Sequence, residues 1–193
     1  MSADPNVPSA AFTEYAADTH WVATHLTQLF GVALIVAALV LLSRRMADGP
    51  AAEWAALGTA GAVASLAIAS ALQAVDGVAL KVMVDRWAAT AEPARTAVFQ
   101  GAFGVRQIEV GLASITSVLF GLTGSVYGIA LLVDGRWPRW IGGSALVAGV
   151  STAIAGVVIA HTGFSSLAMA INMPAGSLLI LWMIVVGVYA WRS

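Results

Sequence analysis

Long runs of apolar residues, separated by shorter polar segments, dominate the pattern along this chain of 193 residues. A helix needs about 20 consecutive, mostly apolar residues to cross roughly 30 Å of hydrocarbon. Five runs meet that length, and the first two contain no Lys, Arg, Asp or Glu. The pattern therefore predicts five transmembrane helices, over residues 21–42, 54–75, 110–133, 140–160 and 174–191.

The start of the fifth helix is placed by a proline. An uncharged stretch from Phe164 to Trp191 is longer than one span requires, and Pro174 lies inside it. Proline fits best in the first turn of a helix, because its missing N–H would have no partner there. We therefore expect the fifth helix to begin near Pro174. Residues 164–173 should form an interfacial or re-entrant turn, with a helical segment as the open alternative.

The segment of residues 76–109, between the second and third spans, is too long for a bare loop. Its apolar residues recur at the spacing of a helix, at Leu80, Val84, Trp87 and Ala91. Pro93 then breaks the run, because the residue before a proline is disfavoured in helical conformation. Spans two and three should therefore continue past the membrane as a helical hairpin, with its tip near residues 91–93.

Composition supports the membrane assignment. Apolar residues make up 60% of the chain and charged residues 10%, and the mean hydropathy is +0.87. Soluble domains have about a quarter charged residues. The fold class is therefore an all-α, polytopic transmembrane bundle of five helices, with residues 1–20 as an extracytoplasmic tail and residues 21–193 as a single domain.

The formal net charge of -1 argues against nucleic-acid binding. Because cysteine is absent, any metal would need histidine and carboxylate ligands.

Arginines beside the short loops indicate an orientation. Lys and Arg are enriched in short cytoplasmic loops. Arginines follow the first, third and fifth spans, at Arg44, Arg45, Arg136, Arg139 and Arg192. This placement predicts an extracytoplasmic N-terminus and a cytoplasmic C-terminus, although the outer segment 76–109 also carries four basic residues, balanced by four acidic ones.

Glycine and tryptophan follow their own patterns along the spans. Glycine recurs at an interval of seven in the fourth span, at Gly142, Gly149, Gly156 and Gly163. Such a face lets helix backbones approach closely and is interpreted as a packing or assembly face. Tryptophan marks the ends of spans, at Trp21, Trp54, Trp137, Trp140 and Trp191. These side chains are interpreted as an interfacial aromatic belt.

Three short motifs resemble a known group of proteins. The run RWPRWIG from Arg136 to Gly142 is similar to the Pro-Arg-Trp-(Leu/Ile)-Gly junction of bacterial multi-spanning membrane proteins that are grouped only as a domain of unknown function. The segment QAVDGVALK, which begins at Gln73, and the His25-Leu26 pair resemble further parts of the same group. The resemblance implies a bacterial cytoplasmic membrane and carries over no reaction, cofactor or site residue.

Ionisable residues at membrane depth form the candidate site. Such groups cost about 2.5–3.5 kcal/mol at the centre of a spanning helix, which makes them functional candidates. Four of them fall in one layer near the outer ends of the first four spans, and we expect them to line a common cavity: His25, Asp76, Glu109 and His161. The expected supporting residues are Arg106, Gln28, Gln73 and Tyr127. Interfacial anchoring, and a structural ion pair between Arg106 and Glu109, are the alternatives.

Two classes of function remain open. In the first, the chain is a non-catalytic membrane component or accessory subunit that forms a homo-oligomer or joins a membrane complex. In the second, the pocket binds haem, a transition metal or a quinone, because imidazole suits Fe, Cu and Zn. His25 and His161 would then be the metal ligands, and Asp76 and Glu109 would orient them or carry protons. Bound lipid is expected in either class, and whether the chain is an enzyme stays open.

The orientation gives a first testable prediction. A reporter fused after Ser193 should be active in the cytoplasm, because the arginines beside the short loops lie on the side of the C-terminus. The measurement is the paired activity of alkaline phosphatase and green fluorescent protein fusions. Strong phosphatase activity from the C-terminal fusion would reverse the orientation.

Overall fold

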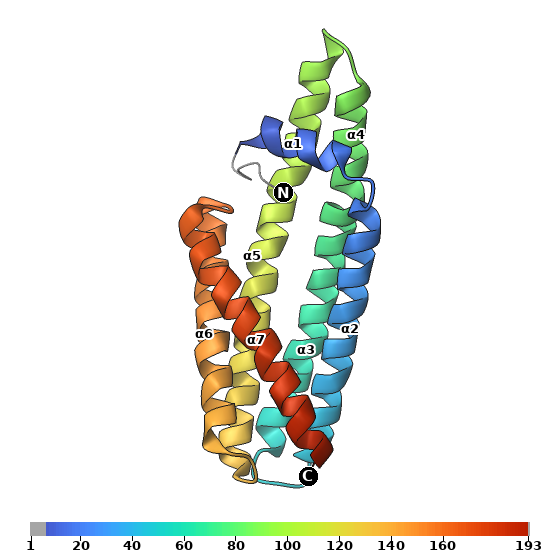
Figure 1. Cartoon of the computed structure of the whole chain (residues 1–193). Helices are drawn as coiled ribbons and strands as arrows, with labels where there is room; N and C mark the ends of the chain where they lie inside the picture. Colours follow the sequence, from blue (N-terminus) through green and yellow to red (C-terminus); the bar gives the residue numbers. More distant parts are fainter. Residues whose placement is uncertain (1–6, 193) are drawn as a thin grey trace.

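Five helices in the described part of the chain are long and apolar enough to cross a membrane, which confirms the five-span prediction. The structure is a computed structural model that describes residues 7–192 (Figure 1). No strand occurs among these residues. The elements are α1 (Pro8–Ala17), α2 (Trp21–Arg45), α3 (Ala52–Gln73), the π-helical segment η1 (Ala74–Leu80), α4 (Lys81–Ala89), α5 (Ala94–Asp134), α6 (Arg139–Thr162) and α7 (Ser166–Arg192).

Two of the spanning helices are much longer than a bilayer requires. Residues 52–89 form one helical run of 38 residues through α3, η1 and α4, and α5 contains 41 residues. At 1.5 Å per residue each is about 60 Å long, roughly twice the hydrocarbon thickness. Their paired ends form the predicted hairpin, whose tip lies between Ala89 and Ala94 at one extreme of the molecule (Figure 1). We call this extreme the hairpin end and the opposite one the loop end.

The expected start of the fifth span at Pro174 is wrong. Helix α7 begins at Ser166 and carries Pro174 in its interior. The reason is a capping interaction: the backbone N–H of Ala168 donates to Ser165 Oγ at 3.2 Å, which satisfies a donor at the start of the helix. Proline inside a membrane helix is tolerated when neighbouring groups satisfy the freed carbonyl. Residues 166–173 are therefore helical rather than a re-entrant turn.

The described part of the N-terminal tail is not a bare segment, because it contains α1. Pro8 stands in the first turn of this helix, where proline is favoured. Phe12 and Tyr15 are buried against α4 and α5. Lys81 Nζ donates to the carbonyl oxygens of Tyr15 at 3.1 Å and Ala16 at 3.0 Å. A cation near the C-terminal carbonyl groups of a helix is favourable. Lys81 therefore stabilises the position of α1, which lies across the helices near the hairpin end (Figure 1).

The glycines of α6 pack against α5 within the same chain. A Cβ atom on Gly149 would lie 2.6 Å from the carbonyl oxygen of Gly121, and one on Gly156 would lie 2.7 Å from that of Ser114. The two backbones are therefore in direct contact. Gly163 does not belong to this face, because it ends α6 with a φ of 62°. The stripe is a packing face inside the chain and is not available for assembly with a second copy.

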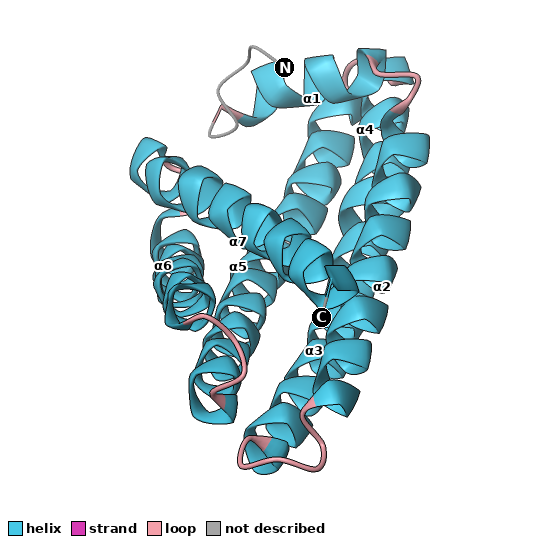
Figure 2. Ribbon diagram, turned by 60° about the horizontal axis from the view of Figure 1, so that its bottom comes forward, coloured by secondary structure: helices cyan, strands magenta, loops and turns pink. Residues whose placement is uncertain are grey.

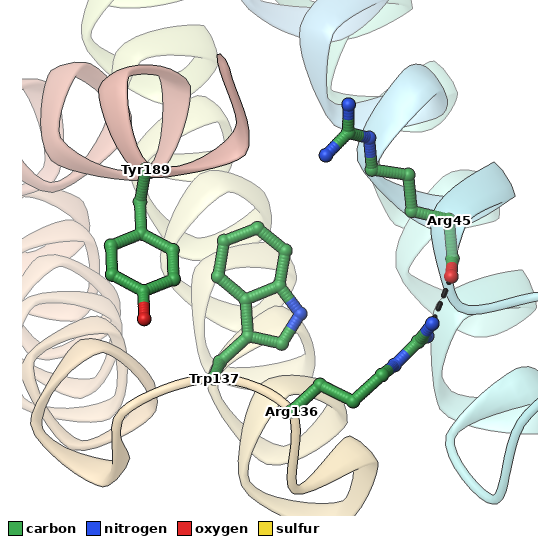
Figure 3. A pocket seen from close by; sticks show the side chains of 4 residues that line it. All are labelled: Arg45, Arg136, Trp137 and Tyr189. Carbon is green, nitrogen blue, oxygen red and sulfur yellow. Dashed lines mark hydrogen bonds between the residues drawn. The ribbon is translucent and has the colours of Figure 1, made fainter. Parts of the chain in front are cut away.

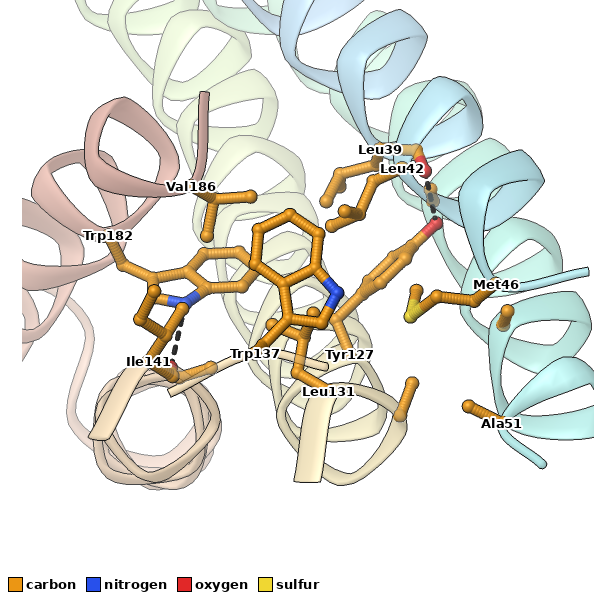
Figure 4. Close-up of a cluster of buried hydrophobic side chains, with 14 of the residues drawn as sticks. Leu39, Leu42, Met46, Ala51, Tyr127, Leu131, Trp137, Ile141, Trp182 and Val186 are labelled. Atoms are coloured by element: carbon orange, nitrogen blue, oxygen red, sulfur yellow. Dashed lines mark hydrogen bonds between the residues drawn. The ribbon is translucent and has the colours of Figure 1, made fainter. Parts of the chain in front are cut away.

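Helix α7 crosses the bundle obliquely, from its contact with α6 toward the loop end of α2 (Figures 1 and 2). Under its final turns lies a buried cluster that includes Tyr127, Trp137 and Trp182 (Figure 4). The Trp182 indole N–H donates to the carbonyl oxygen of Ile141 at 3.0 Å, and the Tyr127 hydroxyl donates to that of Leu39 at 2.9 Å. The buried polar groups of these two side chains thus have hydrogen-bond partners. The cluster holds α2, α5, α6 and α7 together at the loop end.

Alanine substitution of two α6 glycines tests the α5–α6 contact. Gly149→Ala should lower the free energy of unfolding by about 1–3 kcal/mol, because the new methyl group overlaps backbone atoms of α5. The matched control is Gly143→Ala on the same helix, where no heavy atom lies within 4 Å of an added Cβ. The measurement is thermal unfolding in detergent, and equal midpoints for the two variants would show that the contact is not tight.

Candidate functional site

A cavity of about 430 Å³ lies at the hairpin end. It is bounded by α1, α2, η1, α5 and the start of α7, so it draws on segments from the whole length of the chain. Small-molecule pockets have volumes of about 300–1,000 Å³. His25, Asp76 and Glu109, three of the four residues expected to share a cavity, line it together with Arg106 and Gln28.

The His25 imidazole is held between two hydrogen-bond acceptors. Its Nδ1 lies 2.7 Å from the carbonyl oxygen of Trp21, and its Nε2 lies 3.1 Å from Asp76 Oδ2. A carbonyl oxygen only accepts, so Nδ1 carries a proton. The second contact then needs one more proton, which sits either on Nε2 or on the Asp76 carboxyl group. His25 and Asp76 are therefore joined by one hydrogen bond at the wall of the cavity.

The π-helical segment η1 sets the position of Asp76. The Trp21 indole N–H donates to the backbone carbonyl oxygen of Asp76 at 3.0 Å, which ties α2 to this segment. A Cβ atom on Gly77 would lie 2.5 Å from the Cβ of His25, so only glycine lets the two segments approach this closely. Short π-helical turns inside α-helices occur frequently at functional sites. The turn thus places a carboxylate and a close backbone contact against one histidine.

A buried ion pair forms the opposite wall. Arg106 Nη1 donates to Glu109 Oε1 at 2.7 Å, and the two residues are only 6% and 3% exposed. The guanidinium of Arg106 also lies over the Phe164 ring, 4.9 Å from its centroid, and over that of Tyr15, at 5.6 Å. Two charges taken out of water are tolerated only as a hydrogen-bonded pair. The pair is the structural alternative expected from the sequence, here located inside the cavity wall.

Tyr15 closes the cavity from α1. The residue is 6% exposed, and its hydroxyl has no hydrogen-bond partner among the described residues although it lines the cavity. Burial raises the pKa of this phenol, against the opposing effect of Arg106. Tyr15 therefore stays protonated at neutral pH and offers an O–H donor to an occupant of the cavity.

Acidic groups outnumber basic ones around the cavity. Glu14, Asp18, Asp76 and Glu109 line it together with only two basic side chains, Arg106 and His25. Walls of one sign focus a field in a cleft and raise or lower the local concentration of charged solutes. This cavity therefore disfavours anions and is suited to a neutral or cationic occupant.

Three of the predicted site residues lie elsewhere. His161 is exposed and lines a neighbouring cavity of about 480 Å³, so the expectation that it faces His25 in one cavity is wrong. Gln73 precedes η1, and its buried Oε1 has no partner among the described residues. Tyr127 belongs to the buried cluster at the loop end. The π-helical turn begins directly after Gln73, so regular α-helical spacing does not relate Gln73 to Asp76.

Two important residues were not predicted for this site. Tyr15 was expected in the tail and Trp21 in the interfacial belt, yet both are buried and their rings pack against each other at a tilt, with 4.4 Å between centroids. The Trp21 ring also stacks on His25, 4.6 Å away. A helical spacing of four between Trp21 and His25 was the available signal.

The geometry is unlike that of a metal centre. Within residues 7–192, no group of three or more His, Asp or Glu side chains is arranged to hold a metal ion. Both ring nitrogens of His25 already face protein acceptors. A comparison with models of protein families, curated proteins and solved structures finds no match for this chain. The resemblance to the bacterial group of unknown function therefore stays a prediction.

The His25–Asp76 contact can be tested by stability. Asp76→Asn should lower the free energy of unfolding by about 1–1.5 kcal/mol, because a neutral amide forms a weaker hydrogen bond with the partly buried His25 than a carboxyl group does. The control is Asp85→Asn, which breaks the half-exposed i,i+4 pair with Lys81 and should cost about 0.5 kcal/mol or less. Thermal unfolding of both variants in one detergent is the measurement. A smaller loss of stability in Asp76→Asn than in Asp85→Asn would contradict a stabilising hydrogen bond between His25 and Asp76.

Proposed function

We propose that this integral membrane protein binds a small, flat, proton-exchanging molecule of the quinone or quinol class in the cavity at the hairpin end. The proposal places the chain in a bacterial cytoplasmic membrane, with this cavity on the extracytoplasmic side. In it, the His25–Asp76 pair forms a hydrogen bond with an oxygen-bearing group of the bound ring. The protein is thus a binding component, and the proposal assigns it no reaction.

The hydrogen bond between His25 and Asp76 is the observation that carries this proposal. The imidazole has an acceptor at each nitrogen, at 2.7 Å and 3.1 Å. An imidazole can donate or accept a hydrogen bond according to its protonation, and a carboxylate accepts one. The remaining Asp76 oxygen, Oδ1, forms no hydrogen bond within residues 7–192 and belongs to a residue that lines the cavity. Asp76 Oδ1 would accept a hydrogen bond from a hydroxyl group of a quinol.

The other walls complement such a ring. The Tyr15 hydroxyl is a donor for a quinone carbonyl, and the aromatic rings of Trp21 and Phe164 provide apolar surface. The volume of about 430 Å³ accommodates a substituted ring. Thr24 of α2 and Met169 of α7 both line the cavity, so it lies between two helices that face lipid. An apolar tail on the ring would extend from the cavity into the lipid between α2 and α7.

Metal and haem fit this site less well than a quinone. Ligation through His25 would break a hydrogen bond at one of its two nitrogens, and His161 lines a different cavity. Haem or metal would therefore require the wall to rearrange, whereas a ring with hydroxyl or carbonyl groups uses donors and acceptors that are already in place.

Membership in a larger membrane assembly is a second candidate, favoured by the hairpin. The α4–α5 hairpin extends beyond the length that the membrane needs, and Val82 on it is 60% exposed. An element that extends beyond the membrane offers surface for contact with a partner. This role is compatible with ligand binding, since the hairpin tip and the cavity are separate surfaces.

Calorimetry with a short-tailed quinol tests the ligand. Duroquinol titrated into the purified protein should bind, and Tyr15→Phe and Asp76→Asn should each weaken binding about tenfold. Tyr15→Phe removes one hydrogen bond to the ring, and Asp76→Asn replaces a carboxylate acceptor with a weaker, neutral one. Tyr15→Phe breaks no hydrogen bond among the described residues, so it should leave the fold intact. Repeating the titration in buffers of different ionisation enthalpy should reveal proton exchange that Asp76→Asn abolishes.

Two controls make the outcome decisive. Asp85→Asn and His161→Gln lie outside the cavity and should bind the quinol as the unaltered protein does. Absence of binding by the folded, unaltered protein, or equal affinity in the Tyr15→Phe variant, would overturn the proposed ligand.

A further inference from the structure

A second polar cavity, of about 390 Å³, lies at the loop end (Figure 3). It is lined by Arg45, Arg136, Trp137 and Tyr189, which come from α2, the α5–α6 loop and α7. The polar groups of these four side chains are hydrogen-bond donors, and no carboxylate is among them. The cavity therefore has the chemistry of a site for an anion, opposite to that of the hairpin-end cavity.

Two aromatic side chains present unsatisfied donors to this cavity. Trp137 is only 8% exposed, yet its indole N–H has no hydrogen-bond partner among the described residues. Buried tryptophan usually finds a partner for that group. The Tyr189 ring packs at a tilt against that of Trp137, with 5.5 Å between ring centroids, and its hydroxyl likewise lacks a partner within residues 7–192. Figure 3 shows the indole nitrogen turned toward the side of the cavity where Arg136 lies.

Arg136 is held in place by its other donors. Its Nε donates to Asp134 Oδ2 at 2.9 Å, and its Nη2 donates to Asp134 Oδ1 at 2.7 Å and to the carbonyl oxygen of Arg45 at 2.6 Å. The Asp134 side chain is fully covered, whereas that of Arg136 is 62% exposed. The guanidinium is thus pre-oriented, and its Nη1 forms no hydrogen bond in the described part of the chain. Arginine fixed in this way recognises phosphate well.

An apolar groove continues from this cavity between α2 and α7. Its volume is about 250 Å³, and it shares Arg45 with the polar cavity. Its walls include Leu41 and Leu42 of α2 and Met183 and Val186 of α7. Both helices are membrane spans by length and composition, so the groove lies at the depth of the lipid chains. An anionic site and an apolar groove that meet at one arginine match an amphipathic ligand.

We infer that this composite site binds an acidic phospholipid. The phosphate accepts hydrogen bonds from Arg136, Trp137 and Tyr189, and one acyl chain lies in the α2–α7 groove. Five arginines and three acidic residues lie in the terminal turns and loops at this end, and one of the acids, Asp134, is neutralised by Arg136. Basic pockets between transmembrane helices on the cytoplasmic side recognise acidic lipid headgroups. The site thus lies in the leaflet that the predicted orientation makes cytoplasmic.

Native mass spectrometry measures the bound lipid. Protein from nanodiscs of equal parts phosphatidylglycerol and phosphatidylcholine should retain phosphatidylglycerol preferentially. The double variant Trp137→Phe/Tyr189→Phe keeps both rings and removes two donors, so it should lose about tenfold in retained phosphatidylglycerol. Trp140→Phe is the control, because Trp140 is 60% exposed and lies outside the cavity.

A groove-filling variant separates a lipid from a free anion. Gly187 lines the groove, and no heavy atom lies within 4 Å of an added Cβ, so Gly187→Leu fills the space without a backbone collision. It should reduce phosphatidylglycerol retention about as strongly as the double variant, whereas Gly143→Leu on α6, also in open space, should not. Unchanged retention in Gly187→Leu would overturn the inference. So would absence of any preference for phosphatidylglycerol in a protein that binds inorganic phosphate, since a free anion occupies the polar cavity alone.

Discussion

The direct backbone contact between α5 and α6 is the constraint on which the rest of the bundle depends. In lipid, the hydrophobic effect does not press helices together, so close packing of small residues contributes much of the association energy. Gly121 on α5 and Gly149 on α6 make this contact possible. Only residues 163–165 separate α6 from α7, so the position of α6 also fixes where α7 begins. From there α7 runs obliquely and approaches α2 closely only near the loop end (Figures 1 and 2).

Along this oblique course α7 borders a cavity beside α2 at the hairpin end and a smaller groove against α2 at the loop end, and the two differ in chemistry. At the hairpin end, His25 and Asp76 form a hydrogen bond in a cavity that α1 covers. At the loop end, arginine and aromatic donors border an apolar groove. Acidic walls at one end and donors at the other select for different ligands. Helix α7 thus borders both sites.

Much of the candidate site was predictable because charge is costly in lipid. His25, Asp76 and Glu109 were identified on that ground alone, and they line one cavity. His161 was not placed correctly, since depth along a helix says nothing about the direction in which a side chain points. Trp21 was interpreted as an interfacial anchor, yet it packs between Tyr15 and His25. Aromatic residues at span ends look alike in sequence whether they face lipid or a neighbouring helix.

The sequence by itself determined the number of spans, the long hairpin and the layer that holds the ionisable groups. Each of these follows from local quantities, namely the length of apolar runs, the spacing of apolar residues and the cost of charge in hydrocarbon. Only the tertiary structure decided that α1 covers the cavity, that a π-helical turn carries Asp76 to His25, and that the glycine face of α6 packs on α5. These features depend on contacts between residues far apart in the chain. Local pattern cannot supply them, because a helix of given polarity packs equally well in several rotations until its neighbours are fixed.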